Sequence, residues 1–251
     1  MHQTASWKDN VFFILVEPKE SGNIGAAARA IKNMGFRNLC LVKPPEKITD
    51  EAAWFAHNAL DVLDRAEKFP TLSEALSDKA LVVGTTRRTG KRRGMILPVE
   101  QGAEKIVRDS QANKVAILFG REARGLFNSE ADECGLMLTI PTDKAHPSLN
   151  LSQAVLIVAY EIMKAEYAMP EEKKQALPYG LAGHRELEAL YQRVGKALKT
   201  LGYIPRGDRD LEQRIMQNLK HFIGRAGIAE WELNMLHGIC TQIEGRTPGR
   251  K

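Results

Sequence analysis

The chain has 251 residues, of which 43% are hydrophobic, and this is enough for one large domain, or a domain with an appendage, around a buried core. Its net charge at pH 7 is +5, and no apolar run reaches the roughly 18 residues that a membrane-spanning helix needs. These features argue against a membrane protein. The polar start, with no apolar stretch behind it, predicts no secretory signal, and we expect a cytoplasmic location.

The first 170 residues alternate between apolar runs typical of buried strands and segments with helical periodicity. In chain order they predict a strand at Val11–Val16, a helix at Ile24–Met34, a strand at Leu39–Val42, helices at Asp50–Arg65 and Leu72–Leu76, a strand at Ala80–Val83, a helix at Val99–Asp109, strands at Val115–Phe119 and Leu136–Ile140, and a helix at Leu151–Tyr167. Five short strands separated by helices predict an α/β fold, a parallel sheet with helices on both faces. Ligands bind such sheets beyond the carboxyl ends of the strands.

The composition changes near Met169-Pro170, after which a charged linker at Glu171–Gln175 leads into three helical patterns. These patterns cover His184–Leu201, Asp210–Gly224 and Ala229–Ile243. We therefore expect two domains, at residues 1–169 and 170–251. The second carries 14 Lys and Arg against 10 Asp and Glu, whereas the first 170 residues are nearly neutral, so the C-terminal part is the better candidate for contact with a polyanion.

The cysteines Cys40, Cys134 and Cys240 are far apart in the sequence and form no zinc or disulfide pattern. We expect each to be a small buried hydrophobic residue in a reduced protein. No metal site is predicted.

Three polar stretches follow predicted strands. The first, residues 17–29, opens a helix through a glycine-flanked turn, and a helix N-terminus of this kind favours an anion. We expect Asn23 to cap the turn and Arg29 to extend along the helix. The sequence G-x-G-x-x-G is missing here, which argues against a nicotinamide-dependent oxidoreductase.

The second stretch, residues 117–130, ends a strand at Gly120 and then gathers charge at Arg121, Glu122 and Arg124. Such charges are costly beside a buried strand unless they pair or meet a ligand, so an ion-pair network is the alternative to a binding site. The third stretch, residues 140–154, brings Ser148 and Asn150 to a helix start, where Ser148 could act as an N-cap.

A basic loop at Arg87–Arg93 carries five positive charges and no acid. It lacks the glycine spacing and the hydroxyl residue of a P-loop, so a nucleotide hydrolase is not indicated. A basic loop beside the ligand crevice favours binding of RNA phosphates.

The three stretches together resemble the SPOUT class of S-adenosylmethionine-dependent RNA methyltransferases, and more narrowly its TrmH-like branch, which methylates ribose 2′-hydroxyls. Asn23 with Arg29, Gly120-Arg121-Glu122, and Ser148-Leu149-Asn150 are similar to the three motifs of that branch, in the same order. The start of the chain and its helical C-terminal extension are similar to the members that act on cytidine or uridine at position 32 of the tRNA anticodon loop.

The resemblance implies a C-terminal trefoil knot, a homodimer, S-adenosylmethionine as cofactor and tRNA as substrate, with residues 170–251 docking the tRNA. It implies Arg29 as the principal catalytic residue, supported by Asn23, Glu122, Ser148 and Asn150. The implied cofactor pocket consists of Thr85, Thr86, Arg87, Gly120, Ile140, Pro147, Ser148 and Leu149. The expected RNA contacts are Arg29, Arg88, Lys91, Arg92, Arg93 and Arg124. Two alternatives remain open: a methyltransferase acting on ribosomal RNA, and a non-enzymatic RNA-binding protein on the same fold.

Overall fold

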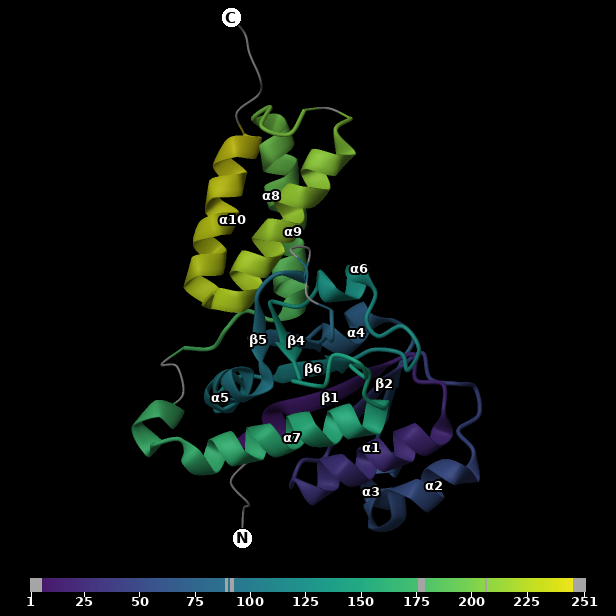
Figure 1. Ribbon diagram of the computed structural model, residues 1–251. Helices are drawn as coiled ribbons and strands as arrows, with labels where there is room; N and C mark the ends of the chain where they lie inside the picture. The colour runs from purple at the N-terminus through teal and green to yellow at the C-terminus, as the bar shows by residue number, and fades with distance from the viewer. Residues whose placement is uncertain (1–5, 89, 91–92, 176–178, 206, 246–251) are drawn as a thin grey trace, which may run out of the picture.

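The computed structural model describes residues 6–88, 90, 93–175, 179–205 and 207–245. Its centre is a seven-stranded sheet in the order β3-β2-β1-β6-β4-β7-β5, in which every paired neighbour is parallel (Figure 1). The strands are β1 (Val11–Val16), β2 (Asn38–Val42), β3 (Glu67–Phe69), β4 (Leu81–Thr85), β5 (Ile96–Pro98), β6 (Val115–Phe119) and β7 (Leu136–Thr139). The predicted parallel sheet is confirmed.

Helices cover both faces of this sheet, as the alternation of side chains in β1 illustrates. Phe13 and Leu15 join one buried cluster, together with residues of α1, α5 and α7, whereas Phe12 and Ile14 join a second cluster with α4 and α6. The helices of this part are α1 (Ser21–Asn33), α2 (Asp50–Ala56), α3 (Leu60–Asp64), α4 (Leu72–Leu76), α5 (Val99–Asp109), α6 (Asn128–Ala131) and α7 (Leu151–Ala168). Two-sided burial explains why the strands are apolar throughout rather than alternating.

Three further helices form the C-terminal extension, which stands beside the β4–β5 end of the sheet (Figure 1). They are α8 (His184–Thr200), α9 (Arg209–Ala226) and α10 (Glu230–Glu244), and they share a small buried cluster of their own. α9 contacts β4 and β7, and its Gly224 lies so close to Gly135 that a Cβ on Gly135 would stand 2.1 Å from the Gly224 backbone. The expected helical extension is therefore present and packs on the α/β body.

Several local expectations were wrong. The single helix predicted over Asp50–Arg65 is divided into α2, a 3₁₀ turn (His57–Ala59) and α3, because His57 adopts a positive φ of 49°. The N-cap of α2 is Thr49 rather than Asp50. Part of the predicted linker forms a short 3₁₀ helix, Glu171–Lys174, and further 3₁₀ residues precede β1 at Trp7–Asn10.

Two short edge strands, β3 and β5, were missed, so the sheet has more strands than the five predicted. The three cysteines are free and buried, as expected. No helix among the described residues is long and apolar enough to cross a membrane.

Candidate active site

A cavity opens at the carboxyl ends of β4, β6 and β7, where the parallel topology predicts a ligand site. Its empty volume is about 820 Å³, part of which is open to solvent. Phe119, Leu126 and Leu138 give it apolar walls, while the residues after β4 bring hydroxyl and guanidinium groups. All eight residues expected to hold a cofactor line this one cavity: Thr85, Thr86, Arg87, Gly120, Ile140, Pro147, Ser148 and Leu149.

Gly120 begins a tight loop, Gly120–Leu126, that forms one wall of the cavity. The amide of Gly125 donates to the Arg121 carbonyl at 2.8 Å, which folds the loop back on itself. A Cβ on Gly120 would lie 2.1 Å from both the Gly125 carbonyl carbon and the Leu126 nitrogen. Only glycine fits at this position, because the opposing atoms are backbone that cannot rotate away.

Asn23, Glu122 and Asn150 come from three separate segments and meet at the edge of the cavity. The Asn150 side-chain amide donates to Asn23 Oδ1 at 2.8 Å, and Asn23 Nδ2 donates to Glu122 Oε1 at 3.2 Å. Glu122 also accepts the backbone amides of Lys19 and Glu20 and lines the cavity itself. The expectation that these three motifs converge therefore agrees with the geometry.

Asn150 is the N-cap of α7, and its Oδ1 accepts both the amide and the hydroxyl of Ser152. Its amide group is therefore fixed at both ends, by α7 and by Asn23. Ser148 is exposed and is not the cap of this helix, which corrects one alternative from the sequence. Asn23 likewise is not a cap: it is buried in the first turn of α1, whose N-cap is Glu20.

Arg29 lies apart from this cluster. Its side chain is exposed on α1, does not line the cavity, and makes no hydrogen bond or ion pair with any residue that the structure describes. Arg29 is therefore not part of the cavity of its own chain, and its exposed guanidinium can meet another molecule.

The predicted RNA contacts divide into exposed and buried groups. Arg88 and Arg124 are exposed, and Arg88 donates to the Arg124 carbonyl at 3.2 Å. Arg93 is only 5% exposed and donates to the Leu126 carbonyl at 3.0 Å, which argues against its assignment as an RNA contact. Burial lowers the pKa of Arg93. Lys91 and Arg92 lie outside the described residues.

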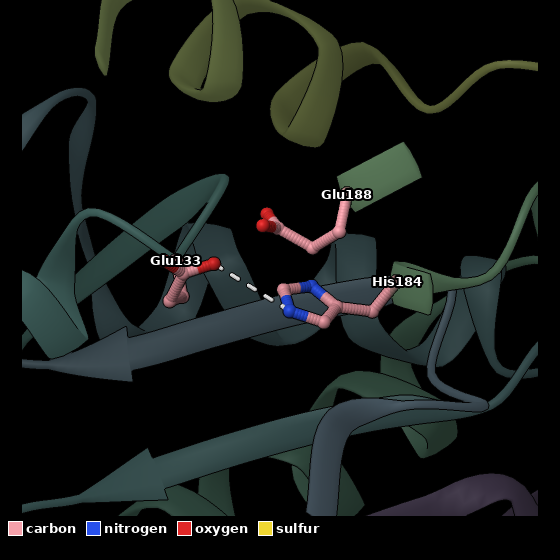
Figure 2. Close-up of side chains that lie close together, drawn as sticks. All are labelled: Glu133, His184 and Glu188. Atoms are coloured by element: carbon pink, nitrogen blue, oxygen red, sulfur yellow. Dashed lines mark ion pairs between the residues drawn. The ribbon is translucent and has the colours of Figure 1, made fainter. Parts of the chain in front are cut away.

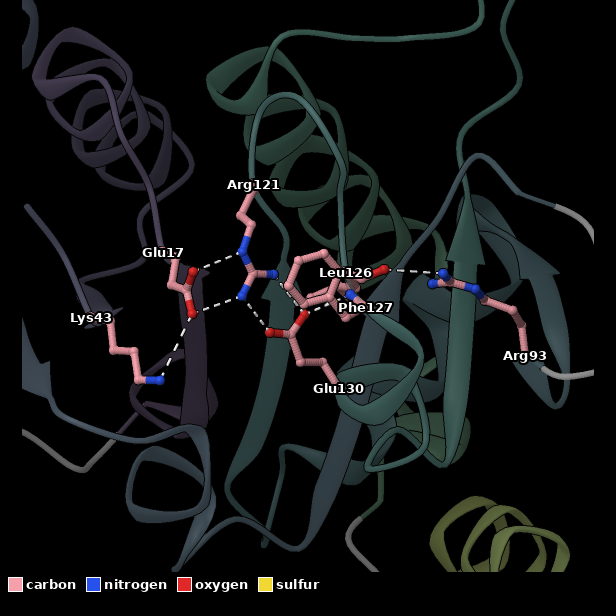
Figure 3. A network of polar contacts seen from close by, with 7 residues as sticks. All are labelled: Glu17, Lys43, Arg93, Arg121, Leu126, Phe127 and Glu130. Carbon is pink, nitrogen blue, oxygen red and sulfur yellow. Dashed lines mark hydrogen bonds and ion pairs between the residues drawn. The ribbon is translucent and has the colours of Figure 1, made fainter. Parts of the chain in front are cut away.

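Arg121 joins the strand ends beside the cavity (Figure 3). Its guanidinium makes two hydrogen bonds to Glu130, at 2.8 and 3.0 Å, contacts both oxygens of Glu17 at 2.8 and 2.9 Å, and lies 3.8 Å from the centre of the Phe127 ring. The hydrogen bonds to Glu130, followed by those to Glu17, raise the pKa of Arg121, and in return the pKa of Glu17 falls. The second motif thus contains the ion-pair network that the charge pattern left open.

A second polar cluster lies between the body and the extension (Figure 2). Glu133, His184 and Glu188 place potential metal ligand atoms within 4.8 Å of one another, and His184 Nε2 is 3.5 Å from Glu133 Oε2. However, the Lys220 ammonium lies 2.9 Å from Glu133 and 2.8 Å from Glu188. This lysine already supplies the positive charge that the two carboxylates require, so we treat the cluster as an ion-pair seam between α8, α9 and the body.

Burial dominates the titration of this seam. It lowers the pKa of His184 and raises the pKa of Glu133. Burial is also the largest single influence on Lys220, but the charges and hydrogen bonds of Glu133 and Glu188 together raise the pKa of this lysine. The three shifts favour a neutral imidazole beside a charged lysine. No pattern in the sequence marks this seam, because its members come from three segments that are distant in the chain.

Comparison with known proteins identifies relatives of both parts of the chain. The family model described as SpoU rRNA methylase matches residues 10–160, and the model for the C-terminal domain of the tRNA methyltransferase TrmJ matches residues 185–251. The tRNA (cytidine/uridine-2′-O-)-methyltransferase TrmJ of Yersinia pestis (strain Pestoides F) is 36% identical over 240 residues, covering 94% of this chain and 91% of that protein.

Two solved structures extend the comparison. TrmJ from Z. mobilis ZM4 superimposes with a TM-score of 0.77 at 32% identity, covering 93% of this chain and 98% of that one. The SpoU methyltransferase AviRb from Streptomyces viridochromogenes, solved in complex with S-adenosylmethionine, has a TM-score of 0.53 at 20% identity and covers 64% of this chain and 62% of that one. The second likeness indicates a shared fold only.

Proposed function

Because this chain belongs to the SpoU methylase family, we propose that it is an S-adenosylmethionine-dependent methyltransferase acting on the ribose 2′-hydroxyl of cytidine or uridine in tRNA. The observation that carries the proposal is the convergence of Asn23, Glu122 and Asn150 beside the cavity. A protein that only bound RNA would have no need to fix three polar side chains from distant segments next to a deep cavity.

The cavity fits the cofactor by its chemistry. Its apolar walls at Phe119, Leu138 and Leu149 suit a purine ring, and the hydroxyls of Thr85 and Thr86 suit a polar group. The close approach of Gly120 to the Gly125–Leu126 backbone leaves the wall free of a side chain at that point. When bound there, S-adenosylmethionine supplies a methyl group on a positively charged sulfur.

The chain's own residues have the task of aligning the ribose. Holding two reactants in the right geometry can supply about 7–11 kcal/mol of a reaction barrier. Asn150 and Asn23 form a rigid pair, and Glu122 and the exposed Ser148 lie where they can orient the nucleotide. We assign Arg29 to the phosphate and to the negative charge that develops on the 2′-oxygen, because a guanidinium stays protonated at neutral pH and is a poor base.

A homodimer reconciles this role with the position of Arg29. The helix α7, which follows the cavity, leaves Leu156 and Tyr160 exposed by 39% and 47%, four residues apart on one helical face. Exposed apolar surface of this kind marks interaction sites. In a dimer, the arginine near the cavity would come from Arg29 of the partner subunit.

This arrangement is testable by mixing two inactive chains. Arg29→Ala retains the cavity, and Gly120→Ala, which disrupts the cavity, retains Arg29. If the two chains share sites, mixed dimers regain part of the methyl-transfer activity; mixtures that stay as inactive as either variant alone would refute a shared site. Sedimentation equilibrium of the unmodified protein measures the dimer directly.

We also propose that the C-terminal half of the α/β body is tied in a trefoil knot. The order of the sheet supports this, because the later strands β6 and β7 lie between earlier ones and α7 returns across α1 and α5. Force spectroscopy can test the knot by pulling the chain from both ends. A knotted chain extends to a shorter contour length than an unknotted chain of 251 residues, because the tightened knot retains part of the chain.

We propose that residues 1–169 form the catalytic domain and that residues 170–251 dock the tRNA. The methylated nucleotide would be nucleotide 32 of the anticodon loop, and the reaction would take place in the cytoplasm. The excess of basic residues in the extension supports this division. A chain that ends at residue 169 should lose tRNA affinity while it keeps cofactor affinity. Equal loss of both would contradict a separate docking role.

The deciding experiment transfers labelled methyl groups from S-adenosylmethionine into total tRNA and ribosomal RNA and maps the modified nucleotide. We expect label in tRNA, at a 2′-O-methyl cytidine or uridine. The description of the matching family as rRNA methylases makes ribosomal RNA the second candidate. Label confined to ribosomal RNA would establish that candidate, and absence of cofactor binding by calorimetry would favour a non-enzymatic RNA-binding protein.

A further inference from the structure

The peptide group between Leu126 and Phe127 is held at both ends by charged side chains. Its carbonyl, on Leu126, accepts from Arg93 Nη2 at 3.0 Å, and its amide, on Phe127, donates to Glu130 Oε2 at 2.7 Å. Figure 3 shows Arg93 on one side of this peptide and Arg121 with Glu130 on the other. Hydrogen bonds to charged groups are about twice as strong as neutral ones, so the orientation of this peptide is fixed.

The Leu126–Phe127 peptide lies at the end of the Gly120–Leu126 loop, which forms a wall of the cavity. Leu126 lines the cavity and is 2% exposed, so it cannot move without changing the cavity's shape. It directly follows Gly125, which has a positive φ of 65° and whose amide donates to the Arg121 carbonyl at 2.8 Å. The backbone hydrogen bond holds the loop up to Gly125, and the side chains of Arg93 and Glu130 hold the peptide that follows.

Arg93 reaches this peptide from the basic loop that the sequence associated with RNA. Arg93 is only 5% exposed, and its guanidinium also donates to Asn128 Oδ1 at 3.4 Å. A guanidinium this deeply buried is not on the surface that an RNA phosphate approaches, and its Nη2 already bonds the Leu126 carbonyl. The exposed Arg88 and Arg124 remain available for RNA, so the basic loop contains two kinds of arginine.

We propose that Arg93 is a positioning residue for S-adenosylmethionine: it fixes the Leu126–Phe127 peptide and, through it, the cavity wall, and it does not contact RNA. The inference rests on the proposed function, because it assumes that the cavity holds this cofactor. Glu130, itself held by Arg121, is the counterpart at the amide end of the peptide.

The test compares Arg93→Met with Arg124→Ala, which removes one positive charge from an exposed position on the rim of the same cavity. Calorimetry measures the Kd of S-adenosylmethionine without RNA, and steady-state methyl transfer gives the KM of each substrate. Arg93→Met should raise the Kd and KM of the cofactor about tenfold, the equivalent of one charge-assisted hydrogen bond, and leave the KM of tRNA within about twofold. Arg124→Ala should do the reverse and also reduce the salt dependence of tRNA binding.

A conservative variant guards against simple unfolding. Arg93→Lys keeps the charge and one donor, so it should fold and show a smaller rise in cofactor Kd, about threefold. Normal cofactor binding by Arg93→Met or Arg93→Lys, with weaker tRNA binding, would overturn the inference and restore Arg93 as an RNA contact. Failure of the unmodified protein to bind S-adenosylmethionine would instead refute the proposed function.

Discussion

The α/β body and the helical extension are stabilised in different ways. In the body, all six residues of β1 are buried and both sheet faces contribute to large apolar clusters. In the extension, α9 has 18 residues of which only Ile223 is buried, and the side chains of Phe222 and Trp231 are 60% and 63% exposed. The extension therefore relies on its contacts with the body, including the seam around Lys220, far more than the body relies on the extension.

The largest effect on cofactor binding should come from Gly120→Ala in the body. The new methyl group would collide with the Gly125–Leu126 backbone, and overpacking of this kind costs about 1–3 kcal/mol, or roughly 5- to 150-fold in affinity. We expect cofactor binding by calorimetry to weaken accordingly. Gly180→Ala is the matched control, since no atom lies within 4 Å of its would-be Cβ. Unchanged cofactor affinity in Gly120→Ala would show that the loop is not part of the cofactor site.

Lys220→Met should separate the two regions. It leaves the carboxylates of Glu133 and Glu188 without their shared counter-charge, and breaking a mostly buried ion pair costs about 3 kcal/mol. Thermal and chemical denaturation should show this loss, while the cofactor Kd stays within about twofold because the cavity is elsewhere. Lys196→Met, at a lysine 72% exposed, should change little. A large rise in cofactor Kd would mean that the seam and the cavity are coupled.

Acidification should weaken the same seam through His184. Its pKa in the folded state lies below the ordinary value of 6.5. As the pH falls past 6.5, the unfolded chain therefore binds a proton that the folded chain does not, and stability declines. The raised pKa of Glu133 acts in the opposite sense at lower pH. The melting temperature should therefore drop between pH 7.5 and 5.5, and the drop should shrink in His184→Gln. Parallel curves for both proteins would exclude this histidine as the cause.

The smallest effect is a gain in the extension. Gly238 lies exposed within α10, with open space around its would-be Cβ. Alanine at an exposed helix position is favoured over glycine by about 1 kcal/mol. Gly238→Ala should stabilise the extension by up to that amount in denaturant titrations and leave cofactor binding unchanged. A destabilised variant would indicate that this face of α10 is covered in solution.

The sequence predicted secondary structure best in segments where every consecutive residue is buried. Strands such as Val11–Val16 and Val115–Phe119 could be predicted to the residue, because both of their faces are buried and every position is apolar. The edge strand at Ile96–Pro98 could not, since it has three residues and ends in proline, which breaks the usual pattern. The break at His57 was equally hidden, because a positive φ at a non-glycine residue has no marker in the sequence.

In the candidate site, the meeting of the three motifs could be predicted from the sequence, but the direction in which each side chain points could not. Asn23 and Glu122 follow the ends of the neighbouring strands β1 and β6, and Asn150 lies after β7 at the same edge of the parallel sheet. Arg93 belongs to a run of basic residues in which nothing distinguishes a buried arginine from an exposed one. Its burial depends on the Leu126 carbonyl, 33 residues away, a partner that only the folded chain reveals.

The order of strands in the sheet has a consequence for how the polypeptide is made. β6 lies between β1 and β4, and β7 lies between β4 and β5, so each fills a gap between strands that leave the ribosome earlier. Until residues 115–119 are synthesised, the nascent chain exposes the unpaired apolar edges of β1 and β4, which are templates for aggregation. We therefore expect the newborn protein to depend on chaperones, and its yield in recombinant cells to rise when growth is slowed by cooling.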